Sequence, residues 1–115
     1  MCGFIGLISE QIDKKKFEES LDIIKHRGPD NTKILFDNRV CLGFNRLAIN
    51  DLSINSDQPF DDKYSSMVFN GEIYNFKDLN RLYNLNARVN SDALVLYELI
   101  KIKREKALQE INGMF

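Results

Sequence analysis

The 115-residue sequence lacks several features that would each assign it to a class of protein. It has no apolar run near the roughly 20 residues that a membrane span requires, so no transmembrane segment is expected. The N-terminus has no basic region and no small-residue cleavage site, which argues against a secretory signal. Neither charge dominates: 16 basic and 17 acidic residues give a net charge of −1. This balance removes the electrostatic signature of nucleic-acid binding.

Histidine and cysteine are also scarce. The sequence contains one histidine, His26, and two cysteines, Cys2 and Cys41. These three residues are too few for a zinc site. Any Cys-His or Ser-His-Asp catalytic arrangement would have to use His26, the one histidine of the sequence. Two separated cysteines without a signal peptide predict a reduced cytoplasmic protein. Cys41 lies in a strand-like pattern and is expected to be an inert buried thiol.

The apolar pattern predicts one mixed α+β unit. The strand-like segments are more numerous than a helix bundle would contain, so a simple bundle is not expected. The expected strands are 2–8 (buried), 32–36 and 39–44 (a hairpin around Asp37-Asn38), 66–70 and 72–74. The first expected helix is 14–26, whose apolar face carries Phe17, Leu21, Ile23 and Ile24. A second is 75–83, capped by Asn75, and a third is capped by Ser91 and places Leu94, Tyr97 and Ile100 in the core. The last expected helix is 105–111. Residues 50–64 read as a long ordered loop.

Cys2 directly follows the initiator methionine. Cysteine is small enough for that methionine to be removed, which would leave a thiol and a free α-amine on one residue. A free thiol titrates near pH ~8.5 and an α-amine near ~8, so such a residue can act as a nucleophile with its own proton acceptor, relayed through a water. A small buried residue in an apolar strand remains the ordinary alternative for Cys2.

Several motifs follow Cys2 in a fixed order. They are His26-Arg27-Gly28-Pro29-Asp30, Arg46-Leu47-Ala48-Ile49, Asn70-Gly71-Glu72-Ile73-Tyr74-Asn75, Ser91-Asp92 and Asn112-Gly113-Met114-Phe115. Together with Met1-Cys2-Gly3, they resemble the class II glutamine amidotransferase domain, the N-terminal-nucleophile (Ntn) glutaminase of glutamine-dependent asparagine synthetases. The resemblance covers the whole chain, and Pro29 favours the asparagine synthetase branch.

The resemblance implies roles for individual residues. Cys2 would attack the carboxamide of L-glutamine, giving a thioester and releasing ammonia, while the Asn70 side chain and the Gly71 backbone N–H form the oxyanion hole. Taken alone, Asn70-Gly71 reads better as a hairpin turn. No cofactor is implied for glutamine hydrolysis, and ATP and Mg²⁺ would belong only to a synthetase domain.

Glutamine is a zwitterion, so its site needs groups of both charges. The resemblance assigns Arg46 to the α-carboxylate, and Glu72 and Asp92 to the amino end. Backbone groups of Ile49 and Asn50 would assist, and Arg27 is a weaker candidate. Read in isolation, Arg46 is a solvated strand residue and Asp92 an acid at a helix N-terminus. Gly28 is expected in a left-handed conformation after the helix.

The chain departs from the family pattern at several positions. Phe44 stands where the family has histidine, Asn50 where it has a small apolar residue, and Ser56 where it has glycine. The resemblance implies an Ntn-hydrolase-type α-β-β-α sandwich of antiparallel sheets, incomplete at the C-terminus. Residues 1–115 would be the N-terminal part of a glutaminase domain, without the synthetase domain.

The sequence therefore favours a glutaminase whose ammonia serves asparagine synthesis from aspartate, with L-glutamine and a separate ATP-dependent synthetase subunit or domain as the expected partners. Two alternatives stay open. The chain could be a catalytically silent remnant that binds glutamine or pairs with a synthetase subunit. It could also be a generic α+β binding domain, although that hypothesis leaves the ordered motifs unexplained.

Overall fold

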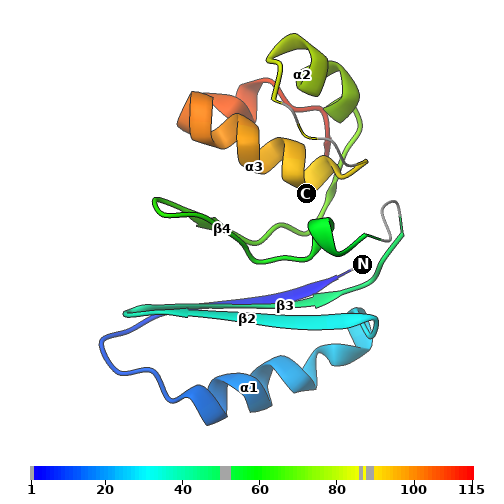
Figure 1. Cartoon of the computed structure of the whole chain (residues 1–115). Helices are drawn as coiled ribbons and strands as arrows, with labels where there is room; N and C mark the ends of the chain where they lie inside the picture. The colour runs from blue at the N-terminus through cyan, green and yellow to red at the C-terminus, as the bar shows by residue number, and fades with distance from the viewer. Residues whose placement is uncertain (1, 50–52, 86, 88–89) are drawn as a thin grey trace. The chain divides into compact units, whose positions relative to one another are not determined.

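The computed structural model describes residues 2–49, 53–85, 87 and 90–115. The described chain divides into two units, Met1–Ala48 with Asp57–Asn70, and Ile49–Ser56 with Gly71–Phe115 (Figure 1). All strand pairs among the described residues are antiparallel. The expected mixed architecture of helices and antiparallel sheets is thus confirmed, and the Ntn-type sandwich stays a prediction.

The first unit is built on a three-stranded sheet with the order β1-β3-β2. Its strands are β1 (Gly3–Ile8), β2 (Asn31–Asp37) and β3 (Val40–Arg46). The expected hairpin is confirmed, with Asp37 opposite Val40 and Asn38 in the turn at φ 45°, a conformation that asparagine tolerates. β3 is the central strand because it pairs on both sides.

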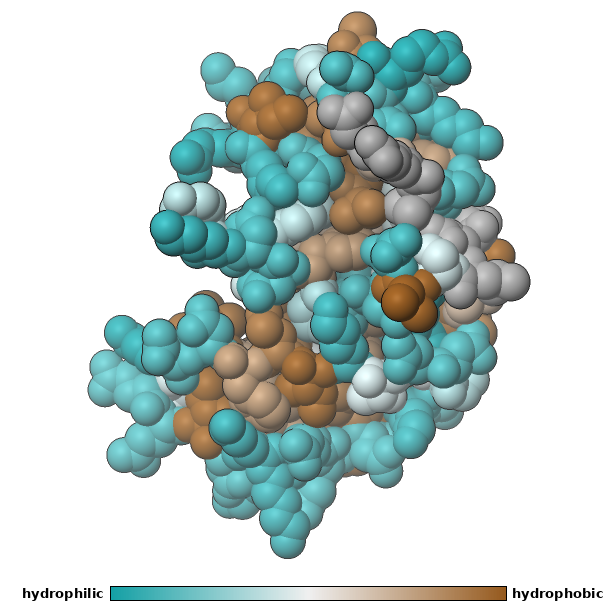
Figure 2. All heavy atoms as spheres, in the orientation of Figure 1, coloured by the Kyte–Doolittle hydropathy of each residue, from teal (hydrophilic) through white to brown (hydrophobic). Residues whose placement is uncertain are grey.

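The prediction that the first strand is buried is wrong within the described chain. β1 lies at the sheet edge, and Phe4, Leu7 and Ile8 are exposed. The apolar run correctly predicted a strand, but whether that strand lies at the centre or the edge of the sheet depends on which strands pair. Figure 2 shows apolar side chains remaining visible on the surface among hydrophilic ones.

Helix α1 (Lys14–Ile23) covers one face of this sheet (Figure 1). Asp13 caps it by accepting from the backbone N–H of Lys16 at 3.1 Å. Its buried residues Phe17 and Leu21 pack on Gly43, where a Cβ atom would lie only 2.8 Å from Leu21 and 2.9 Å from Phe17. A glycine in the central strand therefore lets the helix approach closely.

The expected helix 14–26 differs from the observed one in two respects. α1 ends at Ile23, and the 3₁₀ turn η1 (Lys25–Arg27) follows. Ile23 does not widen the buried face, because it is 76% exposed. A 3₁₀ turn rotates side chains by a different angle from an α-helix, so the helical spacing does not carry through to residue 26.

The segment after the sheet forms a short hairpin of β4 (Phe60–Asp61) and β5 (Ser66–Met67). The strand expected over 66–70 stops early because the Gln58 side chain takes the backbone hydrogen bonds of Phe69. Its Nε2 donates to the Phe69 carbonyl at 3.1 Å, and its Oε1 accepts from the Phe69 N–H at 2.5 Å. The long loop expected over 50–64 contains η2 (Ile54–Ser56) and β4 in its described part.

The second unit pairs β6 (Glu72–Ile73) with β7 (Gly113–Met114). Its helices are α2 (Phe76–Leu82), α3 (Asp92–Lys103) and the 3₁₀ helix η3 (Arg104–Gln109). η3 replaces most of the helix expected over 105–111. The predicted Ser91 cap is confirmed, since its hydroxyl accepts from the Leu94 N–H at 3.3 Å.

The prediction that the Asn75 side chain caps α2 is wrong. Asn75 is the N-cap residue but makes no side-chain cap hydrogen bond. Its Nδ2 donates to the Glu110 carbonyl at 2.9 Å, and its Oδ1 accepts from the Asn112 N–H at 2.9 Å. The long-range bonds thus use the donor and acceptor that a local cap would have used.

The core of the second unit is broader than the expected stripe on α3. Tyr97 is buried as predicted, but Leu94 and Ile100 are only half-buried. Val95, Leu96 and Leu99 are buried as well. Among the described residues, no helix is both long and apolar enough to cross a membrane.

Candidate active site

Cys2 lies just before β1, beside the end of β3. Cys2 is half-buried, and its Sγ accepts from the backbone N–H of Leu47 at 3.3 Å and lies 3.6 Å from the Leu47 carbonyl oxygen. The antiparallel pairing of Gly3 with Asn45 places the two segments together. The Cys2 carbonyl accepts from Nε of Arg27 at 3.1 Å. Cys2 is thus held at both its thiol and its carbonyl.

The Arg27-Gly28-Pro29-Asp30 loop packs against the same end of β3. The Asp30 N–H donates to the Arg46 carbonyl at 3.0 Å, and Asp30 Oδ2 accepts from the Ala48 N–H at 2.8 Å. Both bonds tie Asp30 to the backbone that leads from Arg46 to Ala48. Arg27 therefore contacts the Cys2 backbone, and Asp30 anchors the loop to the end of β3.

The expectation of a left-handed Gly28 is wrong. Gly28 has φ −155° and ψ 82°, a negative φ that other residues also adopt. Glycine is required there for another reason: a Cβ atom would lie 2.1 Å from the Asn45 carbonyl oxygen and 2.6 Å from the Arg46 carbonyl carbon. The loop and β3 touch backbone to backbone, leaving no space for a side chain.

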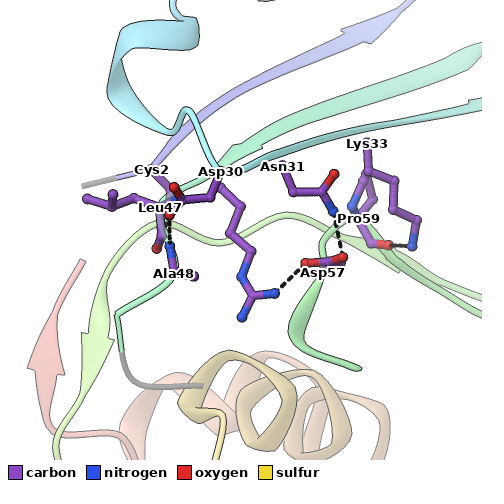
Figure 3. Close-up of polar contacts among 9 residues, drawn as sticks. Cys2, Asp30, Asn31, Lys33, Leu47, Ala48, Asp57 and Pro59 are labelled. Atoms are coloured by element: carbon purple, nitrogen blue, oxygen red, sulfur yellow. Dashed lines mark hydrogen bonds and ion pairs between the residues drawn. The ribbon is translucent and has the colours of Figure 1, made fainter. Parts of the chain in front are cut away.

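Arg46 is the last residue of β3, and it is buried. Its Nη1 donates to Oδ1 of Asp57, whose other carboxylate oxygen accepts from Nδ2 of Asn31 at 2.6 Å (Figure 3). The side chains of Arg46 and Asp57 are only 11% and 15% exposed. Arg46 is therefore an ordered, partly desolvated cation and not a solvated strand residue.

The remaining candidates lie mainly in the second unit. Glu72 is exposed in β6, and Asp92 begins α3. Asp92 Oδ2 accepts from the Ile73 N–H at 2.8 Å, which ties the start of α3 to the residue that follows Glu72. Gly71 is half-buried, and Ile49 is 70% exposed.

The structure brings together part of the predicted set. Within the first unit, Arg27 contacts Cys2 directly, and Arg46 adjoins the Leu47 that contacts the Cys2 thiol. Asn70 ends the same unit and is half-buried, whereas Asn50 lies outside the described residues. The contacts of Asp57 and Asn31 with Arg46 were not predicted, although the strand register opposite Arg46 is a signal that points to Asn31.

The second cysteine is chemically distinct from Cys2. Cys41 is fully buried in β3, and this burial raises the pKa of its thiol to about 11. The thiolate is the reactive form of cysteine, so the buried thiol is almost entirely unreactive near neutral pH. The predicted inert role of Cys41 agrees with this environment.

We expect a thiol alkylating agent at pH 8 to modify only one cysteine of the folded protein. The half-buried Cys2 should react, while Cys41 should stay unmodified until the chain unfolds, because both its burial and its raised pKa oppose reaction. Mass spectrometry of proteolytic peptides, with and without denaturant, distinguishes the two sites. Equal rates of modification at both cysteines in the folded chain would contradict the environment described for Cys41.

Comparison with known proteins gives a consistent result. A family profile described as a glutamine amidotransferase domain matches residues 1–115. The chain is 34% identical over 128 residues to asparagine synthetase [glutamine-hydrolyzing] 1 of Bacillus subtilis (strain 168), covering 100% of this chain and 20% of that protein. It is 31% identical over 123 residues to asparagine synthetase B [glutamine-hydrolyzing] of Escherichia coli (strain K12), covering 100% of this chain and 22% of that protein. The chain thus spans about a fifth of the length of these relatives.

Proposed function

The chain belongs to the glutamine amidotransferase domain family, and from that premise we propose that it hydrolyses L-glutamine to L-glutamate and ammonia through a thioester on Cys2. The observation that carries the proposal is the full-length family match together with a half-buried Cys2 thiol that is held in place by hydrogen bonds. Cys41 offers no alternative nucleophile, because it is fully buried.

In the proposed reaction, removal of Met1 exposes the α-amine of Cys2 as the proton acceptor. Through a water, the amine takes the thiol proton as sulfur attacks the side-chain carbonyl carbon of glutamine. The tetrahedral intermediate then collapses: its C–N bond breaks, and the proton goes to the nitrogen that leaves as ammonia. A water molecule next attacks the thioester carbonyl, which releases glutamate and restores the Cys2 thiol.

Arg27 and Leu47 hold the proposed nucleophile. The Arg27 guanidinium fixes the Cys2 carbonyl, and the Leu47 N–H points at the sulfur. Attack on a carboxamide requires the sulfur to lie within about 3–3.5 Å of the carbon with aligned orbitals, so restricting the motion of Cys2 lowers the entropic cost of the reaction. Arg27 is therefore a positioning residue in this proposal.

We assign the developing oxyanion to the Asn70 side-chain amide and the Gly71 N–H. Both donors are neutral, so they stabilise the transient charge without binding an anionic product too tightly. Loss of one such donor typically costs about 3–4 kcal/mol in the transition state. Glycine at position 71 allows the backbone to approach the substrate closely.

The two charged ends of glutamine are assigned to groups of opposite sign. Arg46 would bind the α-carboxylate, with Glu72, Asp92 and the backbone of Ile49 and Asn50 around the amino end. The buried guanidinium suits a carboxylate, because charge-assisted hydrogen bonds strengthen as water is excluded. Hydrolysis by these groups needs no cofactor in this proposal.

The relatives are named as glutamine-hydrolysing asparagine synthetases, and this supports a destination for the ammonia. We propose that it is transferred to aspartate by an ATP-dependent synthetase domain or subunit, in which ATP and Mg²⁺ would bind. The free cysteines fit the reducing environment of the cytoplasm. In this proposal, residues 1–115 supply the N-terminal part of the glutaminase domain.

An assay of the full chain for equimolar glutamate and ammonia tests this function, and an Arg46→Lys variant tests the carboxylate assignment. Lysine keeps the charge but loses the planar fork of N–H donors. We expect the KM for L-glutamine to rise about tenfold or more, with a smaller change in kcat.

L-Glutaminamide, in which an amide replaces the α-carboxylate, is the matched control substrate. Wild-type protein should prefer glutamine strongly, and Arg46→Lys should weaken this preference. An unchanged KM and an unchanged preference would remove Arg46 from carboxylate binding. Glutamine binding by the wild-type chain without turnover would instead support the silent binding module.

A further inference from the structure

The carboxylate of Asp57 links Arg46, which we propose binds the substrate, to the neighbouring strand β2. Asn31 and Arg46 are opposite each other in the register of β2 and β3. Asp57 contacts both, with Oδ1 accepting from Arg46 Nη1 and Oδ2 from Asn31 Nδ2 at 2.6 Å (Figure 3). The low exposure of the Arg46 and Asp57 side chains, 11% and 15%, keeps water from competing strongly for these bonds.

Asp57 lies on a segment that is itself anchored. Its neighbour Gln58 bonds the backbone of Phe69 through both ends of its side-chain amide. Pro59 accepts from Nζ of Lys33 at 2.9 Å, and Lys33 comes from β2, as Asn31 does. The carboxylate is therefore fixed relative to the sheet that carries Arg46.

A fixed carboxylate changes what an arginine can do. The guanidinium lies at the end of a long flexible stem, and binding a ligand normally requires that this stem be ordered. An anion already in contact with the guanidinium orders this stem before the ligand arrives, so ligand binding does not have to order it. It also lowers the local positive charge, so the effect on ligand affinity depends on whether ordering or charge dominates.

We propose that Asp57 is a positioning residue that, with Asn31, orders the Arg46 guanidinium to receive the α-carboxylate of glutamine, an inference that rests on the function proposed above. Ordering dominates because the Asp57 carboxylate is divided between two donors and is held by its own segment. The opposite hypothesis, in which Asp57 competes with the substrate for Arg46, predicts an effect of the opposite sign.

The test uses Asp57→Asn and the exchanged pair Asn31→Asp/Asp57→Asn in the full chain. Arg46 and Asn31 donate to different carboxylate oxygens, so an asparagine at position 57 would turn an NH₂ donor toward one of them and would lose the negative charge. We expect Asp57→Asn to raise the KM for L-glutamine about tenfold while kcat stays within about twofold. The exchange puts the carboxylate on the strand position opposite Arg46, where cross-strand Cβ atoms lie about 5 Å apart, and should return the KM to within about threefold of wild type.

Asp61→Asn is the matched control, because Asp61 lies in β4 of the same segment, is exposed and bonds only Ser66 among the contacts described. Its KM should equal that of the wild type. A fall in KM in Asp57→Asn would show competition, and an unchanged KM would show no effect on binding. Either result overturns the proposal.

The ordering of Arg46 can be measured without any turnover. In spectra of ¹⁵N-labelled arginine, a held guanidinium shows separate, slowly exchanging Nη signals, which Arg46→Lys assigns by their loss. These signals should be present in wild type and in the exchanged pair, and averaged in Asp57→Asn. Separate signals that persist in Asp57→Asn overturn the proposal, whereas absence of glutamine hydrolysis by the wild type counts against the proposed function alone.

Discussion

Replacement of Cys2 by alanine is expected to lower the rate of ammonia release from L-glutamine by about ten-thousandfold or more, because loss of the nucleophile removes covalent catalysis entirely. Binding of glutamine should change little, since Arg46, Glu72 and Asp92 carry the proposed contacts with its charged ends. A coupled ammonia assay measures turnover, and calorimetry measures glutamine binding by the variant.

Cys41→Ala is the matched control for this loss. It removes the other thiol, which is fully buried on β3, and should reduce stability while leaving the turnover of folded protein near the wild-type value. Turnover that survives in Cys2→Ala would exclude Cys2 as the nucleophile.

The N-terminus of the active protein gives a further check on the same mechanism. Intact-mass measurement should show that Met1 is absent, because only then is the α-amine of Cys2 free to accept the proton. Full activity in protein that retains Met1 would contradict the amine as the base while leaving the thiol assignment in place. The nucleophile and the proton acceptor are thus tested separately.

Gly28→Ala is expected to have the second large effect, on stability. The added methyl would lie 2.1 Å from the Asn45 carbonyl oxygen, so backbone must move and not just a flexible side chain. Overpacking of this kind costs about 1–3 kcal/mol and sometimes more, and we expect the upper part of this range. The melting temperature should fall by roughly 10 °C or more, as measured by circular dichroism.

Gly6→Ala is the appropriate control glycine. Its added Cβ would meet Leu42 Cδ2 at 3.4 Å, which is an ordinary contact. Its melting temperature should therefore stay within a few degrees of the wild-type value. If Gly28→Ala were equally harmless, the close packing of the loop on the end of β3 would be wrong.

The features that the sequence predicted well depend on neighbours along the chain. The hairpin around Asn38, the Ser91 cap and the start of the helix at Lys14 each follow from local turn chemistry, capping and apolar spacing. Local preference failed where a distant partner offered better hydrogen bonds. Asn75 bonds Glu110 and Asn112 in place of capping α2, and Gln58 ends the strand expected to reach residue 70.

The candidate site shows the same division. The order of the motifs from Cys2 to Asp92 identifies the family without any coordinates, and the comparisons confirm that resemblance. No motif indicated that Asp57 contacts Arg46, because the two residues belong to segments whose association depends on the path of the intervening chain. The strand register placed Asn31 opposite Arg46, but only the folded chain placed a carboxylate where it reaches both.

The sequence by itself determined the family, the proposed nucleophile and most of the local structure, since spacing, caps and turns act over a few residues. Tertiary structure alone decided that β3 is central and β1 lies at an edge, that Gly28 is needed for close backbone contact, and that Asp57 holds Arg46. The physical reason is that these features arise from strand pairing and packing between segments distant in sequence, where the available space and the unsatisfied hydrogen-bond donors are fixed only when the chain folds.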